Sequence, residues 1–114
     1  MDKNFVILEG QVGNDLKYGV ASNGMNYATF TLCVNPYFKD IHDSTESNQP
    51  MTYIRLFVYD QKKVNYMKRL NIGRGNRVSV FARLNSARTE INGKDIIQNN
   101  VVVRDICLIK TKED

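Results

Sequence analysis

The sequence contains little cysteine and histidine, no tryptophan, only 2 prolines and no long apolar run. Cys33 and Cys107 stand far apart in apolar segments. Neither has the spacing to a histidine that a metal site requires, so both are expected to be reduced, buried thiols. His42, the single histidine, lies in a polar stretch, where a solvated side chain is the simpler interpretation. Without a better-placed histidine, no Ser–His–Asp or Cys–His catalytic set can form. We therefore expect no enzymatic activity, no metal and no cofactor.

Membrane and secretion signals are missing as well. No apolar run approaches the roughly 20 residues of a membrane-spanning helix, and the N-terminus lacks the charged and apolar segments of a signal peptide. The protein is therefore expected to be cytoplasmic and to bind no membrane. Its 114 residues suffice for one domain, which we assign to residues 1–110, with residues 111–114 as a short C-terminal end. The net charge of +4 is compatible with a polyanionic partner.

What the chain does contain is a series of segments in which apolar and polar residues alternate. The expected strands cover residues 5–12, 27–35, 52–59, 77–84 and 96–109. Within residues 61–70, the apolar residues Val64, Met67 and Leu70 recur at every third position. This stripe predicts a helix that is capped by Asp60 and stopped by Gly73. Four local features are also expected: a bulge or bend at Gly10, a long loop over residues 37–50, a tight hairpin turn at Asn92-Gly93, and a bend near Arg104-Asp105.

The order of these segments indicates a fold class. Three strands, one helix and two further strands are the order of the OB fold, an all-β five-stranded barrel with one α-helix between strands 3 and 4. Closing the sheet into a barrel removes its exposed edges. A small SH3-like barrel is the alternative, but it does not usually place a full helix at this point.

The third expected strand is the most informative part of the chain. Its inward set is Ile54, Leu56 and Val58, and its outward set is Tyr53, Arg55, Phe57 and Tyr59. Three aromatic side chains and a guanidinium on an outer face need a cover. Unpaired nucleobases are one such cover, since each base stacked on an aromatic ring contributes about 1–3 kcal/mol. Burial against a second subunit or under the polar loop is the alternative, and both can hold at once.

The fourth expected strand repeats this pattern. Its inward set is Val78, Val80, Ala82 and Leu84, and its outward set is Arg77, Ser79, Phe81 and Arg83. Further candidate contacts are Arg88 and Lys94 at the hairpin tip, Arg74 and Lys17 in the same groove, and Phe38 at the mouth of the long loop. Tyr18 is either another stacking platform or an anchor for its loop. Any one of these cations alone is explained by a solvated surface, but together they form a candidate phosphate track.

Several stretches in order resemble one protein family. Residues 4–15 (NFVILEGQVGND) resemble the opening of bacterial single-stranded DNA-binding proteins (SSB), and ATFTL at residues 28–32 continues the same register. YIRLFVY at residues 53–59 is similar to the aromatic strand of that family, and residues 66–80 to its helix, turn and fourth strand. The resemblance covers about residues 4–109 and implies the same barrel.

The resemblance also implies site residues and partners. The stacking aromatics of the family would fall on Phe38, Tyr53 and Tyr59, whereas a further family tryptophan would fall near Arg88-Thr89, where contacts would be electrostatic. SSB-like barrels assemble as dimers or tetramers, so a homo-oligomer is expected. The sequence ends soon after the last expected strand without a linker and acidic tip, so recruitment of repair enzymes through such a tail is not expected.

These observations favour sequence-tolerant binding of single-stranded DNA by base stacking and phosphate contacts. The implied role is protection of single strands in replication, recombination, repair or mobile-element transfer, in a short form without a tail. The alternative is a relative of the primosomal replication protein N, or a protein-interaction OB module whose aromatic face binds a replication partner.

Overall fold

The structure is a computed structural model that describes residues 2–14, 16–35 and 50–110. Phe38 lies outside the described residues. The elements in chain order are β1 (Val6–Val12), β2 (Lys17–Val20), β3 (Asn26–Val34), β4 (Thr52–Val58), α1 (Gln61–Arg69), β5 (Arg77–Ile91) and β6 (Lys94–Lys110). The expected all-β class with one helix after the third expected strand is confirmed. β2 is an additional short strand that the sequence patterns did not predict.

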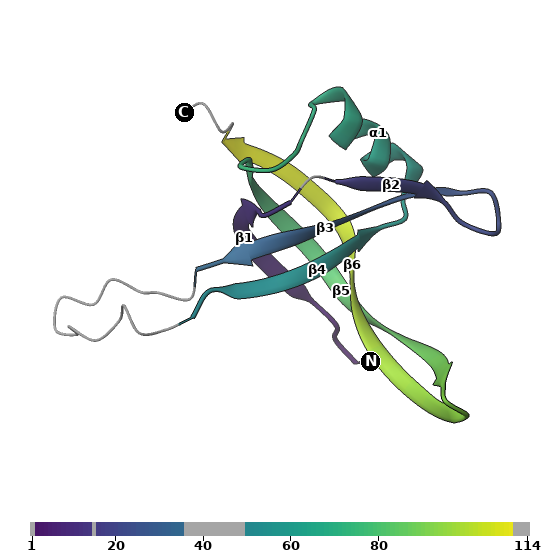
Figure 1. Ribbon diagram of the computed structural model, residues 1–114. Helices are drawn as coiled ribbons and strands as arrows, with labels where there is room; N and C mark the ends of the chain where they lie inside the picture. The colour runs from purple at the N-terminus through teal and green to yellow at the C-terminus, as the bar shows by residue number, and fades with distance from the viewer. Residues whose placement is uncertain (1, 15, 36–49, 111–114) are drawn as a thin grey trace, which may run out of the picture.

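The strands form one sheet that closes on itself (Figure 1). Its order is β1-β5-β6-β4-β3-β2, and a further pairing joins β1 to β3, so five strands make a ring and β2 lies outside it. The ring is closed on one side by Gln11 and Val12 pairing with β3, and on another by a short parallel contact of β4 with β6. The predicted five-stranded barrel is therefore present, with β2 added as the hairpin partner of β3.

The core fills the barrel and extends under the helix, which lies across one end (Figure 1). Its fully buried side chains include Phe30 and Leu56 from the barrel and Val64 and Met67 from α1. The last member of the predicted helical stripe, Leu70, is 40% exposed because the helix has ended there. The expected inward sets of β4 and β5 are confirmed by their burial, apart from Leu84.

The two ends of α1 are set by polar residues. The Asp60 side chain accepts a hydrogen bond from the backbone N–H of Lys62, as a helix N-cap does. At the other end, Asn71 adopts a left-handed backbone with φ of 53° directly after the C-cap, so the helix stops before Gly73. The predicted N-cap is confirmed, whereas Asn71 ends the helix in place of the expected glycine.

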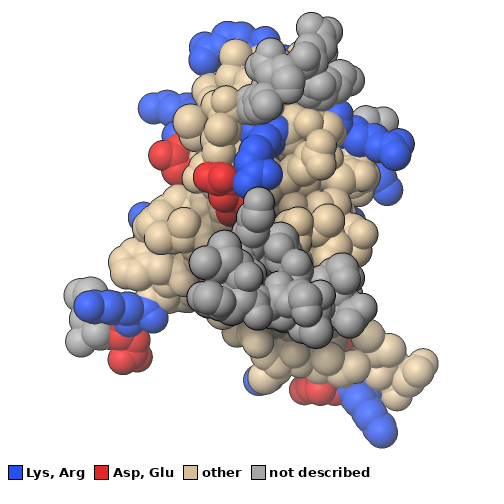
Figure 2. Space-filling model, turned by 90° about the vertical axis from the view of Figure 1, so that its left-hand side faces the viewer, with Lys and Arg blue, Asp and Glu red and all other residues tan. Residues whose placement is uncertain are grey.

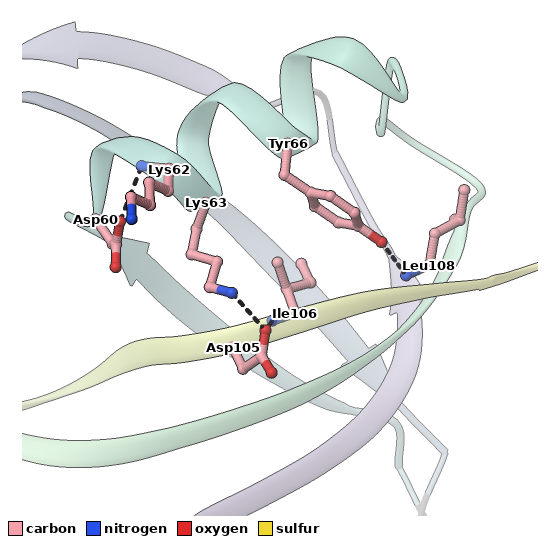
Figure 3. A network of polar contacts seen from close by, with 7 residues as sticks. All are labelled: Asp60, Lys62, Lys63, Tyr66, Asp105, Ile106 and Leu108. Carbon is pink, nitrogen blue, oxygen red and sulfur yellow. Dashed lines mark hydrogen bonds and ion pairs between the residues drawn. The ribbon is translucent and has the colours of Figure 1, made fainter.

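Two side chains of α1 join it to β6 (Figure 3). The Lys63 ammonium lies 2.9 Å from the Asp105 carboxylate, and the Tyr66 hydroxyl accepts a hydrogen bond of 3.2 Å from the backbone N–H of Leu108. The hydrogen bond from Lys63 holds the pKa of Asp105 below its usual value, while the same contact raises the pKa of Lys63. These contacts fix the start of the helix beside β6, where it borders the site described below.

Strands β5 and β6 continue beyond the barrel as a long hairpin, called the arm here (residues 84–101; Figure 1). Its turn is Asn92-Gly93, with positive φ angles of 53° and 78°, as the sequence predicted. Leu84 was expected in the core but is 46% exposed, because it begins the arm. A register shift opposite Phe81 leaves Arg104 as an extra residue on β6, which confirms the expected bend.

Two expectations about small residues, the cysteines and Gly10, were wrong in part. Cys107 is exposed, because it lies at an outward position of β6, and Cys33 is only partly buried; both thiols are free. Of the bulge or bend expected at Gly10, the bulge is absent, because β1 pairs with β5 through this residue without a register shift. The role of Gly10 is close contact with β3, since a Cβ atom there would lie 2.3 Å from the carbonyl oxygen of Cys33.

Candidate nucleic-acid interface

The outer face of β4 and the residue just after the strand carry the aromatic row, which we define as Tyr53, Arg55, Phe57 and Tyr59. Tyr53 is 68% and Tyr59 44% exposed, although both are large aromatic side chains. The Arg55 guanidinium lies 5.6 Å from the centre of the Phe57 ring, and that ring lies 6.1 Å from the Tyr59 ring with 8° between their planes. Arg55, Phe57 and Tyr59 therefore form one continuous surface, and Tyr53 at the start of the row is the most exposed of its rings.

Two grooves border the aromatic row along the seam between β4 and β6. The amide groove is lined by Tyr53, Ile54, Arg55 and Phe57 on β4 and by Gln98, Asn99, Asn100 and Val101 on β6. The basic groove is lined by Met25, Tyr59, Asp60, Gln61, Lys62, Arg83, Val102, Val103 and Arg104. Because β4 and β6 run parallel here, the two grooves follow one another along the seam. An extended polymer can thus contact both.

Several of these lining residues were not expected from the sequence. Lys62 and Arg104 enter the basic groove because the anchored helix and the bend in β6 bring them there. Gln98, Asn99 and Asn100 line the amide groove from the arm, and the Asn99 side chain also accepts a hydrogen bond from the Ser86 hydroxyl. A run of three consecutive amide side chains inside an expected strand is an unusual pattern and was the available signal for that groove.

The strand register places two predicted cations on the face of the aromatic row. Directly opposite residues of paired strands lie on the same face of a sheet. Phe57 is opposite Val102 on one side and Thr29 on the other. Val102 is opposite Arg83, and Thr29 is opposite Lys17. Arg83 and Lys17 therefore flank the aromatic row from its two sides.

The two predicted cations of the arm lie on different sides of it. Lys94 is paired with Ile91, an odd-numbered position of β5 like Arg83, and so shares the side of Arg83. Arg88 is paired with Ile97 at the alternate positions and lies on the other side. Only Lys94 continues the cationic edge that Arg83 begins.

Arg74 lies away from the aromatic row, so the expectation that it lines the same groove was wrong. It borders a third groove together with Leu16, Tyr18, Lys68, Asn71, Ile72 and Gly73. Tyr18 is opposite the core residue Ala28 and so points to the helix side, where the Lys68 ammonium lies 4.8 Å from its ring centre. Partial burial there raises the pKa of Tyr18. Tyr18 is thus an anchor against the helix.

Phe81 also lies away from the aromatic row. It forms the β1 patch, which we define as Phe5, Ile7 and Phe81. Phe81 is opposite Ile7, and its ring lies 5.5 Å from that of Phe5. The three side chains are 61%, 71% and 36% exposed, respectively. Phe81 was predicted among the nucleic-acid contacts; it lines neither groove of the seam and packs against Phe5 in this separate apolar surface.

The positive charge is distributed over several edges of the molecule. On the face shown in Figure 2, most lysine and arginine side chains lie around the outline and some lie near the middle, and several of the fewer acidic side chains lie next to them. Arg77 and Lys63 form ion pairs with Glu9 and Asp105 at 2.9 Å. Among the described residues, the cations that line the two grooves form no ion pair, so they remain available to an anionic ligand. They are Arg55, Lys62, Arg83 and Arg104.

Residues 2–14, 16–35 and 50–110 contain no group of three or more histidine, cysteine, aspartate or glutamate side chains that could hold a metal ion. The same residues contain no helix long and apolar enough to cross a membrane.

The closed five-stranded barrel, the helix between β4 and β5 and the accessible face of β4 define an OB-fold protein. The model of the single-strand binding protein family matches residues 3–109. The chain belongs to this family.

Three solved structures show the same fold. A Plasmodium falciparum SSB in complex with ssDNA has a TM-score of 0.77 and 23% identity, covering 96% of this chain and 97% of that one. The S. cerevisiae mitochondrial single-stranded DNA binding protein Rim1 has a TM-score of 0.73 and 16% identity, with coverages of 96% and 97%. A small single-stranded DNA-binding protein from Streptomyces coelicolor has a TM-score of 0.68 and 17% identity, covering 96% of both chains. Among curated protein sequences, none matches this chain.

Proposed function

We propose that the protein binds single-stranded DNA with little sequence preference, through the aromatic row and the cations that flank it. The observation that carries this proposal is the row itself: exposed, contiguous rings and a guanidinium beside two grooves that an extended strand can follow. Rings stack on any base, because every base has a π-face, so this chemistry tolerates sequence. Arg55 can stack on a base or contact a phosphate.

The cations supply the phosphate contacts in this proposal. Arg83, Lys17 and Lys94 share the face of the aromatic row or its continuation on the arm, and each phosphate that they neutralise releases counterions. Arg74 and Arg88 lie outside this face and would contact only a DNA strand that extends beyond it. Phe38 remains a proposed stacking residue. The role that follows is protection of single strands during replication, recombination, repair or mobile-element transfer.

The β1 patch supports a homo-oligomer, either a dimer or a tetramer. Three large apolar side chains lie together on the β1–β5 surface. β1 pairs with β3 only through Gln11 and Val12, so within the described chain the rest of that edge has no partner strand. An apolar face beside an open strand edge is suited to a second copy of the same edge, which would cover both.

The proposal is tested by fluorescence-anisotropy titration of the protein into labelled oligo-dT, with a duplex of the same length as control. We expect tighter binding to the single strand and a logarithm of the binding constant that falls linearly with the logarithm of the salt concentration. Absence of binding to oligo-dT at low salt would reject the proposal. Binding of this protein to a replication protein in the absence of nucleic acid would then favour the protein-interaction alternative.

A further inference from the structure

The aromatic row has a continuation on the neighbouring hairpin. Tyr27 on β3 is opposite Gly19 on β2 and lies 6.3 Å from Tyr59, with 48° between the ring planes. It is at the register position beside Tyr59, since Ala28 is opposite Val58. The rings of Phe57, Tyr59 and Tyr27 therefore form one surface that turns from β4 towards β2.

Gly19 leaves the space that the Tyr27 ring occupies. A Cβ atom at residue 19 would lie 2.6 Å from both the Cζ and the Oη of Tyr27, closer than real Cβ atoms come to other atoms. Gly19 does not adopt a left-handed backbone, so its conformation does not require glycine. Glycine is therefore required at residue 19 only because the Tyr27 ring occupies the space beside it, on the outer surface of the hairpin.

Other side chains around Tyr27 fit a nucleotide. Met25, in the turn between β2 and β3, is 51% exposed and lines the basic groove with Tyr59. Lys17 lies two residues before Gly19 and so on the same face of β2. Among the described residues, the Tyr27 hydroxyl forms no hydrogen bond, in contrast to that of Tyr66, which accepts one from β6. Tyr27 thus has no anchoring contact of the kind that holds Tyr66.

We infer that the β2–β3 hairpin carries a further nucleobase site, formed by Tyr27 with Met25 and Tyr59 and kept open by Gly19. The ligand class is an unpaired base of the strand that crosses the seam, with its phosphate beside Lys17. The inference rests on the proposed function and extends the bound strand beyond β4. It predicts that longer oligonucleotides gain affinity from contacts that shorter ones do not reach.

The test compares four proteins, each titrated with oligo-dT of increasing length: wild type, Tyr27→Leu, Tyr27→Phe and Tyr18→Leu. Tyr27→Leu removes the ring and is expected to weaken binding of the long oligonucleotides by about 5- to 150-fold, while the shortest bound one is little affected. Tyr27→Phe keeps the ring and is expected to bind as wild type does. Tyr18→Leu changes the tyrosine on the opposite side of the same hairpin, so its affinity is expected to equal that of wild type.

Gly19→Ala is an independent test, since it leaves the tyrosine in place and displaces its ring. The expected result is a length-dependent loss like that of Tyr27→Leu. The inference is overturned if Tyr27→Leu binds every length as wild type does, or if the loss is equal at all lengths and accompanies a lower melting temperature. Those outcomes leave the proposed function standing, whereas failure of the wild type to bind oligo-dT overturns both.

Discussion

Phe57 near the end of β4 and Tyr59 just after it have ring planes only 8° apart and ring centres 6.1 Å apart. The strand produces this relationship, because residues two apart point to the same side. Nearly parallel rings can receive successive bases in similar orientations, whereas Tyr27 is tilted by 48° against Tyr59 and turns the surface towards β2. The geometry thus supports a strand that follows β4 and then bends.

The flanking cations should control the salt dependence of binding. Arg83→Ala and Lys94→Ala are each expected to reduce the slope of log K against log salt by about 1, if each contacts one phosphate. Arg69→Ala is the matched control, because it removes an equal charge from the helix end, where the guanidinium lies 5.9 Å from the Tyr66 ring. Anisotropy titrations at several salt concentrations measure the slopes. Equal slopes for all variants and wild type would show that these cations take no part.

The hydroxyl of Tyr66 should contribute to stability and not to binding. Tyr66→Phe removes the acceptor for the Leu108 N–H and is expected to lower the free energy of unfolding by about 1 kcal/mol, measured by urea denaturation. The affinity for oligo-dT is expected to stay at the wild-type value. An unchanged unfolding midpoint would show that water replaces the phenol without cost.

The contact between Lys63 and Asp105 predicts a pH dependence. The folded state lowers the pKa of the Asp105 carboxyl, chiefly through the hydrogen bond from Lys63. The contact therefore stabilises the fold above the pKa of the unfolded carboxyl, and this contribution is lost as the pH falls through the folded pKa. Asp105→Asn should lower the urea midpoint slightly at pH 7, and the difference from wild type should vanish in acid. A difference that persists in acid would assign the effect to packing.

The β1 patch should hold the oligomer together. Ile7→Lys places a charge on a side chain that is 71% exposed in the monomer, so it is expected to dissociate the oligomer with little effect on the fold of each chain. Ile97→Lys on the arm, where the side chain is 63% exposed, is the control and should leave the assembly intact. Sedimentation velocity gives the mass in each case. A monomeric wild type, or an Ile7→Lys protein that stays assembled, would contradict the assignment.

Local patterns in the sequence were sufficient for the barrel and for the aromatic row. Alternation along β4 separates Leu56 from Tyr53 and Tyr59 without any knowledge of the partner strands. It was not sufficient where the position depends on strands far apart in sequence. Phe81 alternates outward like Arg83, yet its ring packs against Phe5 beside β1 and lines neither groove of the seam.

The grooves and the arm illustrate the same limit. Lys62 becomes a lining residue only because α1 is anchored to β6, and Leu84 is exposed only because β5 continues past the barrel. Tyr27 was missed because its partner, Gly19, lies on a strand of four residues whose pattern is too short to be recognised. These features depend on register and closure, which a single strand does not encode.

The most direct test of the account is the affinity of Tyr53→Ala/Tyr59→Ala for labelled oligo-dT, compared with Tyr53→Phe/Tyr59→Phe and with wild type. The double alanine variant loses two stacking rings and is expected to bind weaker by about 2–6 kcal/mol, while the double phenylalanine variant binds nearly as wild type does. A double alanine variant that is folded and binds as tightly as wild type would contradict the claim that the aromatic row holds the bases.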